Sequence, residues 1–366
     1  MKKLLSILAC FPLFFLSCNS ENDLLKEGEM IFLKHKGASM PLLMRGNFSS
    51  DVIILMVHGG VGGSSSAHIE DLSSFIEPEY LVAYWDQRHS GASQGKMDES
   101  DLTIDQMAED MQMAIRLLRH KYGADKKIFA LCHSWGVILS TYYLLKFENE
   151  LDGIIQSNGS HNAYLEYEAR LDYVNTFGKE MQDKGISLSE KFEVEGESFN
   201  NVEEILAWTA ANDTIINGKQ VNILWDLAGK GIAPYVEETY VQESDVPNRI
   251  STQELNFYSP YNPLTDLINN AKIGSILDPE DDPESSVQEF YDFSPMMDKI
   301  TLPVALYWGR YDHIIGPAVA EAYYELIATP AEDKELIIYE RSDHTPMFIE
   351  NVKFSQDMIN FIEKHK

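Results

Sequence analysis

Residues 126–136 read KKIFALCHSWG, an apolar β-type run that leads directly into a sharp turn at Ser134. A helix-forming stretch, residues 137–147, follows at once. A serine held between a strand and a helix adopts a strained backbone geometry, which lifts its hydroxyl out of the sheet and directs the following N–H groups to the same point. The stretch therefore predicts a nucleophile at Ser134. The alternative is a buried strand followed by a serine that caps a helix.

The turn requires small residues on both sides of the serine, because the strand and helix backbones nearly touch there. Gly136 provides one of them, and Cys132 stands where glycine is more usual, so the segment nearly matches the Gly-x-Ser-x-Gly pattern. Cys132 lies on the predicted strand rather than at the turn. We therefore do not expect Cys132 to act as the nucleophile.

The residues that could activate this serine lie near the end of the chain. A serine hydroxyl is a poor nucleophile until a histidine takes its proton, and that histidine needs a carboxylate to orient it. A strand predicted at residues 302–308 is followed by Asp312, and a strand predicted at residues 335–339 is followed by His344. Serine, acid, histidine is the chain order of triads built on such strand-to-helix turns. We therefore predict a catalytic triad of Ser134, Asp312 and His344.

Two neighbouring residues compete for these roles. His313 and Asp343 each adjoin a chosen residue, so either could be the partner instead. We prefer Asp312 because it comes first after its strand, and His344 because it lies beyond the last strand.

An anion-stabilising loop is predicted after the apolar run at residues 52–57, which is typical of a strand buried on both faces. The run ends in HGGVGGS at residues 58–64, where glycines let the backbone turn an N–H towards the reaction centre. We assign the oxyanion hole to the N–H groups of Gly60 and Trp135. We also expect substrate contacts from His58, Gly59 and His133.

The same glycine-rich loop has a nucleotide-binding alternative. Gly60 and Gly62 follow a strand, and Asp86 ends the next apolar run, as a ribose-binding acid would. However, a dinucleotide fingerprint needs a third glycine at the position of Ser65, and no lysine completes a phosphate loop.

These motifs together resemble those of the α/β-hydrolase superfamily and, within it, the proline iminopeptidase-like serine hydrolases. The resemblance rests on HGG at 58–60 with glycines at 62 and 63, WDQRHSGAS at 85–93, HSWG at 133–136, GRYD at 309–312 and SDHTP at 342–346. It implies an α/β fold with a doubly wound, mostly parallel sheet and a helical cap inserted before the acid-bearing strand. It also implies that the triad hydrolyses an ester or amide bond through an acyl-enzyme.

The cap departs from the family pattern. Proline iminopeptidases hold the free amine of the substrate with cap carboxylates, one of them in a motif resembling Trp-x-x-Trp-Glu. Residues 207–212 read AWTAAN here, with alanine and asparagine where the second tryptophan and the glutamate would stand. Glu203 and Glu204 lie about one helical turn away and Asp213 is adjacent, so another carboxylate could serve. We expect Trp208 and Glu204 to bind the substrate. An aminopeptidase of the proline iminopeptidase type is therefore one expectation, and a small-acyl carboxylesterase is another. A non-catalytic cell-surface binding lipoprotein on the same fold is a third.

The resulting division of the chain has four parts. We predict a signal peptide at 1–17, a tether at 18–28, a hydrolase core at 29–160 and 296–366, and a helical cap at 161–295.

The N-terminus has the pattern of an export signal. Two lysines precede an apolar stretch at residues 4–16, which is too short to cross a bilayer as a permanent helix. FLSC at residues 15–18 resembles a bacterial lipoprotein cleavage box, with Cys18 as the lipid-bearing residue. The box ending at Cys10 fits better but leaves too short an apolar core. We expect an exported, lipid-anchored protein of the bacterial cell envelope, and a plain secretory signal is the rival interpretation.

Composition limits the partners. The chain has 366 residues and a net charge of −29, which argues against binding to nucleic acid or to anionic lipid by charge. Membrane attachment is expected through the lipid on Cys18 only, and after processing Cys132 is the one cysteine left, so no disulfide can form. No spacing of histidine, cysteine and carboxylate residues indicates a metal site, and we expect no cofactor. The expected partner is a small-molecule or short-peptide substrate, and the sequence leaves the oligomeric state open.

Overall fold

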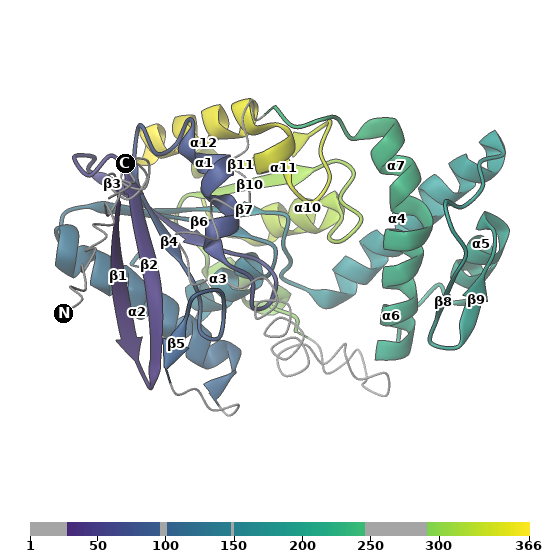
Figure 1. Ribbon diagram of the computed structural model, residues 1–366, viewed down its shortest axis with the longest axis horizontal. Helices are drawn as coiled ribbons and strands as arrows, with labels where there is room; N and C mark the ends of the chain where they lie inside the picture. Colours follow the sequence, from purple (N-terminus) through teal and green to yellow (C-terminus); the bar gives the residue numbers. More distant parts are fainter. Residues whose placement is uncertain (1–27, 96–100, 148–149, 246–290) are drawn as a thin grey trace, which may run out of the picture.

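The computed structural model describes residues 28–95, 101–147, 150–245 and 291–366. The predicted signal peptide, Cys18, nearly all of the predicted tether and residues 246–290 of the predicted cap lie outside the described residues. Helices cover both faces of one large sheet, and a separate group of helices stands beyond one end of the sheet (Figure 1).

The sheet confirms the expected doubly wound, mostly parallel architecture. Its strands follow the order β1-β2-β4-β3-β6-β7-β10-β11, with the short β5 paired to β2. The neighbours from β4 to β11 pair in parallel, whereas β2 is antiparallel to β1, β4 and β5. The strands are β1 (Gly28–His35), β2 (Ala38–Gly46), β3 (Val52–Val57), β4 (Leu81–Trp85), β5 (Gln94–Gly95), β6 (Lys127–His133), β7 (Gly153–Ser157), β10 (Val304–Gly309) and β11 (Lys334–Tyr339).

Successive residues of the central strands pack into two different cores, because strand side chains alternate between the faces of a sheet. In β3, Leu55 and Val57 join one core while Ile54 and Met56 join the other. This arrangement explains why the central strands read as continuous apolar runs. The helices are α1 (Ile69–Ser73), α2 (Ile104–Tyr122), α3 (Trp135–Lys146), α10 (Pro317–Leu326), α11 (Pro346–Ile349) and α12 (Asn351–His365).

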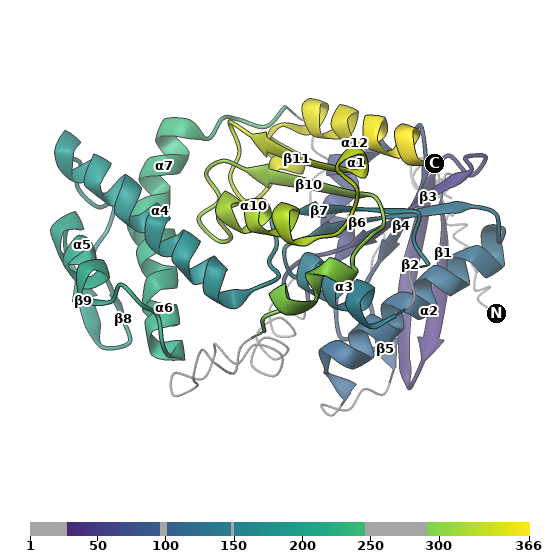
Figure 2. The same cartoon turned by 180° about the vertical axis from the view of Figure 1, so that it is seen from behind.

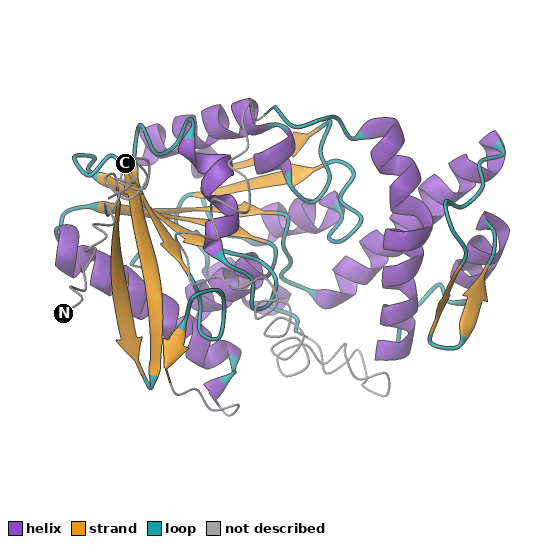
Figure 3. Cartoon of the chain, in the orientation of Figure 1, coloured by secondary structure: helices purple, strands orange, loops and turns teal. Residues whose placement is uncertain are grey.

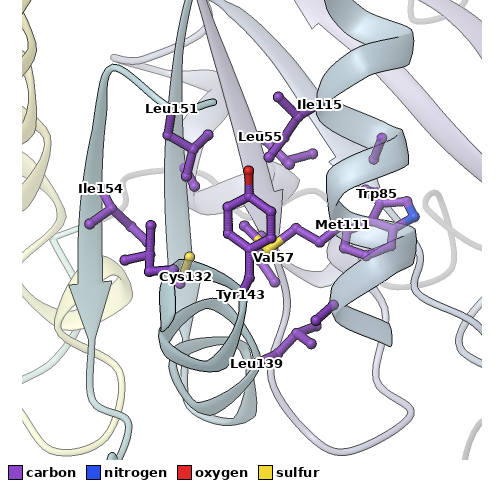
Figure 4. Packing of buried hydrophobic residues seen from close by; sticks show 14 of the residues in the cluster. Leu55, Val57, Trp85, Met111, Ile115, Cys132, Leu139, Tyr143, Leu151 and Ile154 are labelled. Atoms are coloured by element: carbon purple, nitrogen blue, oxygen red, sulfur yellow. The ribbon is translucent and has the colours of Figure 1, made fainter. Parts of the chain in front are cut away.

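The first core lies under α2, α3 and α10, and the second lies under α1, α11 and α12 (Figure 2). Figure 4 shows part of the first core, where Met111 of α2 and Tyr143 of α3 pack over Val57 of β3. Cys132 belongs to this core and is fully buried. Its side chain therefore fills the space beneath the elbow rather than facing solvent.

Residues 163–240, between β7 and β10, form a second helical layer with an apolar core of its own. Its elements are α4 (Ala163–Lys184), β8 (Phe192–Val194), β9 (Glu197–Phe199), α5 (Val202–Ala211), α6 (Gly218–Asp226), a π-helical segment (Leu227–Ile232) and α7 (Ala233–Tyr240). The β8–β9 hairpin (Figure 3) was not expected from the sequence, which lacks a strong β-type run there. Its turn residues Glu195 and Gly196 both have positive φ, which suits a tight hairpin.

Within the described ranges, none of the helices combines the length and the apolar composition needed to cross a membrane.

Candidate active site

Ser134 occupies the junction between β6 and α3. Its backbone has φ 55° and ψ −121°, a conformation that residues other than glycine rarely adopt. The Ser134 N–H donates to the carbonyl oxygen of Ser157 at the end of β7, at 3.0 Å. The serine is thus held at the carboxyl edge of the sheet in the strained geometry that the sequence predicts.

Two glycines make this junction possible. A Cβ atom at Gly136 would lie 2.2 Å from the carbonyl oxygen of Val57, so α3 and β3 approach too closely for any side chain. A Cβ atom at Gly59 would lie 2.8 Å from Cβ of Ser134. The loop after β3, which contains Gly60, therefore passes directly beside the serine, where an oxyanion donor would have to be.

The orientation of Cys132 explains why the elbow does not require glycine two residues before Ser134. Its side chain points into the core between β6 and α3 (Figure 4), away from the turn itself. Burial raises the pKa of the Cys132 thiol to about 12, so the reactive thiolate is scarce at neutral pH. This agrees with the expectation that Cys132 is not a nucleophile.

The structure brings Asp312 and His344 together. Nδ1 of His344 donates to Oδ2 of Asp312 at 2.9 Å, and Oδ1 of Asp312 accepts from the N–H groups of Ile314 and Ile315 at 2.9 and 3.0 Å. This pairing leaves Nε2 of His344 as the ring nitrogen that could take a proton from another group.

The charges of this pair support each other. Burial opposes ionisation of Asp312, but the nearby His344 and four hydrogen bonds outweigh it and lower the pKa of the carboxyl group. Burial also opposes protonation of His344, but the charge and hydrogen bond of Asp312 outweigh it and raise the pKa of the imidazole. Asp312 is therefore ionised at neutral pH and favours the imidazolium form of its partner.

The two competing residues have other positions. Oδ1 of Asp343 accepts hydrogen bonds from the backbone and hydroxyl of Thr345, at 3.0 and 2.9 Å. His313 is largely buried, and its Nδ1 has no hydrogen-bond partner. The structure thus pairs Asp312 with His344, as the preferred assignment requires.

His133 connects the elbow to the loop that carries His344. Its Nε2 donates to the backbone carbonyl oxygen of His344 at 2.9 Å, and the two rings lie 4.9 Å apart. Burial, then the neighbouring His344 and His68, hold the pKa of His133 well below its usual range. His133 is therefore neutral and acts as a fixed donor to the histidine loop.

His58 and Gln87 connect the glycine loop to Trp135. Nδ1 of His58 donates to the carbonyl oxygen of Gly59 at 2.8 Å, and its Nε2 accepts from the N–H of Gln87 at 3.2 Å. The side chain of Gln87 donates to the carbonyl oxygen of His58 and accepts from the Trp135 indole, at 2.9 and 3.1 Å. The two stretches that carry the predicted oxyanion donors are therefore braced by one buried amide, which the sequence analysis did not identify.

Asp86 has a structural role rather than the ribose-binding role of the nucleotide alternative. Its carboxylate accepts from the backbone and hydroxyl of Ser65, the hydroxyl of Ser64 and the backbone of Ala92, at 2.8 to 3.0 Å. These bonds hold the glycine loop against the turn after β4. The carboxylate is therefore already occupied within the protein.

The structure does not bring Glu204 and Trp208 to the site, which corrects their predicted role as substrate-binding residues. Both lie on α5, in the part of the cap farthest from the sheet (Figure 1). Glu204 accepts hydrogen bonds from Asn200 and Asn201 at the start of its own helix. Trp208 packs in the core of the cap. The two residues stabilise the cap instead.

Two other cap carboxylates lie closer to the predicted triad. Glu166 on α4 accepts from Arg170 at 2.8 Å and from Tyr291 at 3.0 Å, and its charge contributes to the raised pKa of His344. Burial, and then the charge of Asp343, raise the pKa of Glu237 on α7. Helical periodicity alone does not reveal that these two helices, rather than α5, face the triad.

A groove of about 400 Å³ lies between α4 and the start of α10 and reaches Asp312. Its walls include Tyr173, Phe177 and Arg310. In the part of the chain that the structure describes, no group of three or more histidine, cysteine or acidic side chains could hold a metal ion.

Comparisons with known proteins agree with the fold. A family model described as the alpha/beta hydrolase fold matches residues 52–350. A curated proline iminopeptidase of Saccharolobus solfataricus is 26% identical over 314 residues, which is 85% of this chain and 84% of the relative.

Solved structures show the same fold at low sequence identity. A proline iminopeptidase of Mycobacterium smegmatis has a TM-score of 0.60 at 12% identity, covering 92% of this chain and 98% of that one. An esterase of Exiguobacterium antarcticum has a TM-score of 0.54 at 15% identity, covering 92% and 100%. The chain therefore belongs to the α/β-hydrolase family and resembles its proline iminopeptidases.

Proposed function

We propose that this hydrolase cleaves an ester or amide bond through an acyl-enzyme formed on Ser134. The observation that carries the proposal is the hydrogen bond of 2.9 Å between Nδ1 of His344 and Oδ2 of Asp312, on loops at the same edge of the sheet as the strained serine. Supporting it, His133, which precedes Ser134, donates to the backbone of His344.

In the proposed reaction, Oγ of Ser134 attacks the carbonyl carbon while Nε2 of His344 takes the hydroxyl proton. Asp312 stabilises the imidazolium that forms. When the carbon–oxygen or carbon–nitrogen bond breaks, His344 returns this proton to the leaving alcohol or amine. A water molecule then attacks the acyl-enzyme with His344 again as the base, which releases the acid and restores Ser134.

The N–H groups of Gly60 and Trp135 are the proposed oxyanion donors. Gly60 has φ 99°, a left-handed backbone conformation that a side chain would disfavour. Trp135 is the first residue of α3. Each donor of this kind contributes about 3 kcal/mol of transition-state stabilisation.

Aminopeptidase activity is the favoured form of this chemistry. The similarity to proline iminopeptidases extends over most of both chains. Glu237 supplies negative charge beside Asp343, near the triad, where a substrate ammonium group would be attracted. It replaces Glu204 as the proposed amine-binding residue, because the Glu166 carboxylate is already paired with Arg170 and Tyr291.

A substrate panel tests the proposal. The purified protein and Ser134→Ala are assayed with aminoacyl arylamides that carry a free amine, the same arylamides with a blocked amine, and small acyl esters. Cleavage confined to free-amine amides and lost in Ser134→Ala is expected. Hydrolysis that persists in Ser134→Ala contradicts the nucleophile, and a preference for esters regardless of the amine would identify a carboxylesterase.

A matched pair of cap variants tests the amine site. Glu237→Gln should raise KM for free-amine substrates about 10-fold, because a charge-assisted contact is lost. The neighbouring Glu238 lines a separate groove with Met181 and Ile186, whereas Glu237 is close enough to Asp343 to be affected by its charge, so Glu238→Gln should leave KM unchanged. Equal KM values in the two variants would remove Glu237 from the proposed site.

A further inference from the structure

One short segment at the end of β7 contacts two members of the proposed triad and the loop that carries the third. The carbonyl oxygen of Ser157 holds the backbone of Ser134, and the side chain of the next residue, Asn158, reaches both Asp312 and the histidine loop. We propose that Asn158 is a positioning residue whose amide shares the Asp312 carboxylate with His344 and ties their two loops together. The inference rests on the proposed function, because it gives Asn158 a role in the same site.

The hydrogen bonds of Asn158 define its orientation. Its Nδ2 donates to Oδ2 of Asp312 at 2.7 Å and to the carbonyl oxygen of Asp343 at 3.3 Å. Its Oδ1 accepts from the hydroxyl of Ser157 at 3.0 Å. Since a carboxylate and a carbonyl oxygen only accept, the NH₂ group of the amide must face the two loops.

Asn158 completes the set of donors around the Asp312 carboxylate. Oδ1 is filled by two N–H groups of its own loop, from Ile314 and Ile315, and Oδ2 is shared between His344 and Asn158. An ionised carboxylate offers about four acceptor positions, and all four are used. Asn158 directly follows β7, whose last residue, Ser157, holds the backbone of Ser134. The Asn158 amide therefore links the acid loop to β7.

The backbone of Asn158 is adapted to this task. Its φ is 51°, in the left-handed region that asparagine tolerates better than most side chains do. The residue is also fully buried. A buried amide in this conformation is costly unless its hydrogen bonds are satisfied, and here its partners are the acid and the histidine loop.

Loss of the amide should change the titration of His344. The charged and titratable groups that face His344 are Asp312 and Asp343 on its own side, Glu166 on α4, His133 on β6 and His313 on the acid loop. The backbone donors still hold Asp312 in place when the Asn158 amide is removed. More of the negative charge of Asp312 then acts on the His344 imidazole, so the pKa of His344 should rise.

The test is an NMR titration of His344 in the full chain carrying Ser134→Ala, with and without Asn158→Gly. Glycine accepts the left-handed backbone, so the substitution removes only the side chain. We expect His344 to titrate at higher pH in Asn158→Gly. A second variant, Asn158→Asp, retains the shape and places a like charge beside Asp312, so it should raise the pKa of His344 further. An unchanged or lowered pKa in both variants would overturn the inference.

Activity supplies the second measurement. With Ser134 intact, Asn158→Gly should lower kcat about 10- to 100-fold, the effect of one lost hydrogen bond to a charged group, and should move the acid limb of kcat/KM to higher pH. Ser140→Ala, which removes another buried hydroxyl without touching Asn158 or its partners, is the matched control and should keep the acid limb. A lower kcat with an unmoved acid limb would show a merely structural role and overturn the inference. Turnover that survives Ser134→Ala would overturn the proposed function, while the titration result would still stand.

Discussion

At the scale of single residues, the backbone of Ser134 shows how the fold holds the proposed nucleophile. A residue other than glycine in this conformation costs about 1–3 kcal/mol, and it persists only where its surroundings fix it. Here the N–H of Ser134 is bonded to β7, and Gly59 packs against its side chain. The surrounding strands therefore support a strained turn that an isolated peptide would not keep.

The pKa of His344 predicts the pH dependence of the activity. A general base must be unprotonated, and the charge of Asp312 outweighs burial and raises the pKa of His344 above its ordinary value of 6.5. We therefore expect kcat/KM to be maximal above this raised pKa and to fall as the pH drops through it, in a pH–rate profile on a neutral ester.

Asp312→Asn is the matched variant for this profile. It removes the charge that raises the pKa of His344, so the acid limb should move to lower pH while kcat falls about 10³- to 10⁴-fold. An acid limb that stays in place in Asp312→Asn would contradict the assigned pair.

At the scale of elements, the elbow depends on the close approach of α3 to β3. In Gly136→Ala, the new methyl group would overlap the backbone of Val57. Neither α3 nor β3 can shift easily to make room for it. We expect a loss of about 1–3 kcal/mol in the free energy of unfolding, measured by urea denaturation, and a fall in kcat from the displaced serine.

Gly229→Ala is the control for this substitution. A Cβ atom at Gly229 would meet only the His313 ring, at an ordinary 3.9 Å. The free energy of unfolding should change by less than about 1 kcal/mol. Equal effects of the two substitutions would refute the steric account of the elbow.

A buried ion pair joins three elements behind the glycine loop. Arg88, after β4, donates to both carboxylate oxygens of Asp110 on α2 at 2.7 and 2.9 Å, and His35 at the end of β1 contacts Asp110 at 2.7 Å. Because Asp110→Ala would leave the buried guanidinium without its partner, it should cost about 3–5 kcal/mol of unfolding free energy.

Asp105 lies on the same helix but is exposed, and its ion pair with Lys146 is at the surface. Asp105→Ala should therefore cost less than about 1 kcal/mol in the same denaturation assay. Similar losses in both variants would argue against the pair as the brace of this region.

At the scale of the whole molecule, the hydrolase core could be predicted because each residue of the predicted triad follows a strand. The predicted strand at 52–57 coincides with β3, and the strands before Asp312 and His344 match β10 and β11 within two residues at each end. In a parallel sheet the carboxyl ends of all strands lie at one edge, so the sequence could place the three residues at that edge.

The cap could not be predicted in the same way. Helical periodicity indicates which side of α5 is apolar, but it does not indicate which neighbour that side meets, and Trp208 faces the core of the cap. Asn158 escaped prediction because a single asparagine after a strand has no distinguishing pattern. Its role depends on a left-handed backbone and on two loops that lie far away in the sequence.

The proposed lipid anchor is tested in cells. Metabolic labelling with a fatty-acid analogue should mark the wild-type chain and Cys10→Ser, because we propose Cys18 as the modified residue, and should be lost in Cys18→Ser. Absence of label from the wild-type chain would favour the plain secretory signal, and label that persists in Cys18→Ser would indicate another site.

The central claim is that Ser134 is a nucleophile activated by His344 and Asp312. Its most direct test is treatment with a fluorophosphonate, followed by intact mass measurement and peptide mapping. The account predicts one adduct per chain on Ser134, absent in Ser134→Ala and formed much more slowly in His344→Gln. An adduct on another residue, or equal labelling of the wild-type chain and Ser134→Ala, would contradict it.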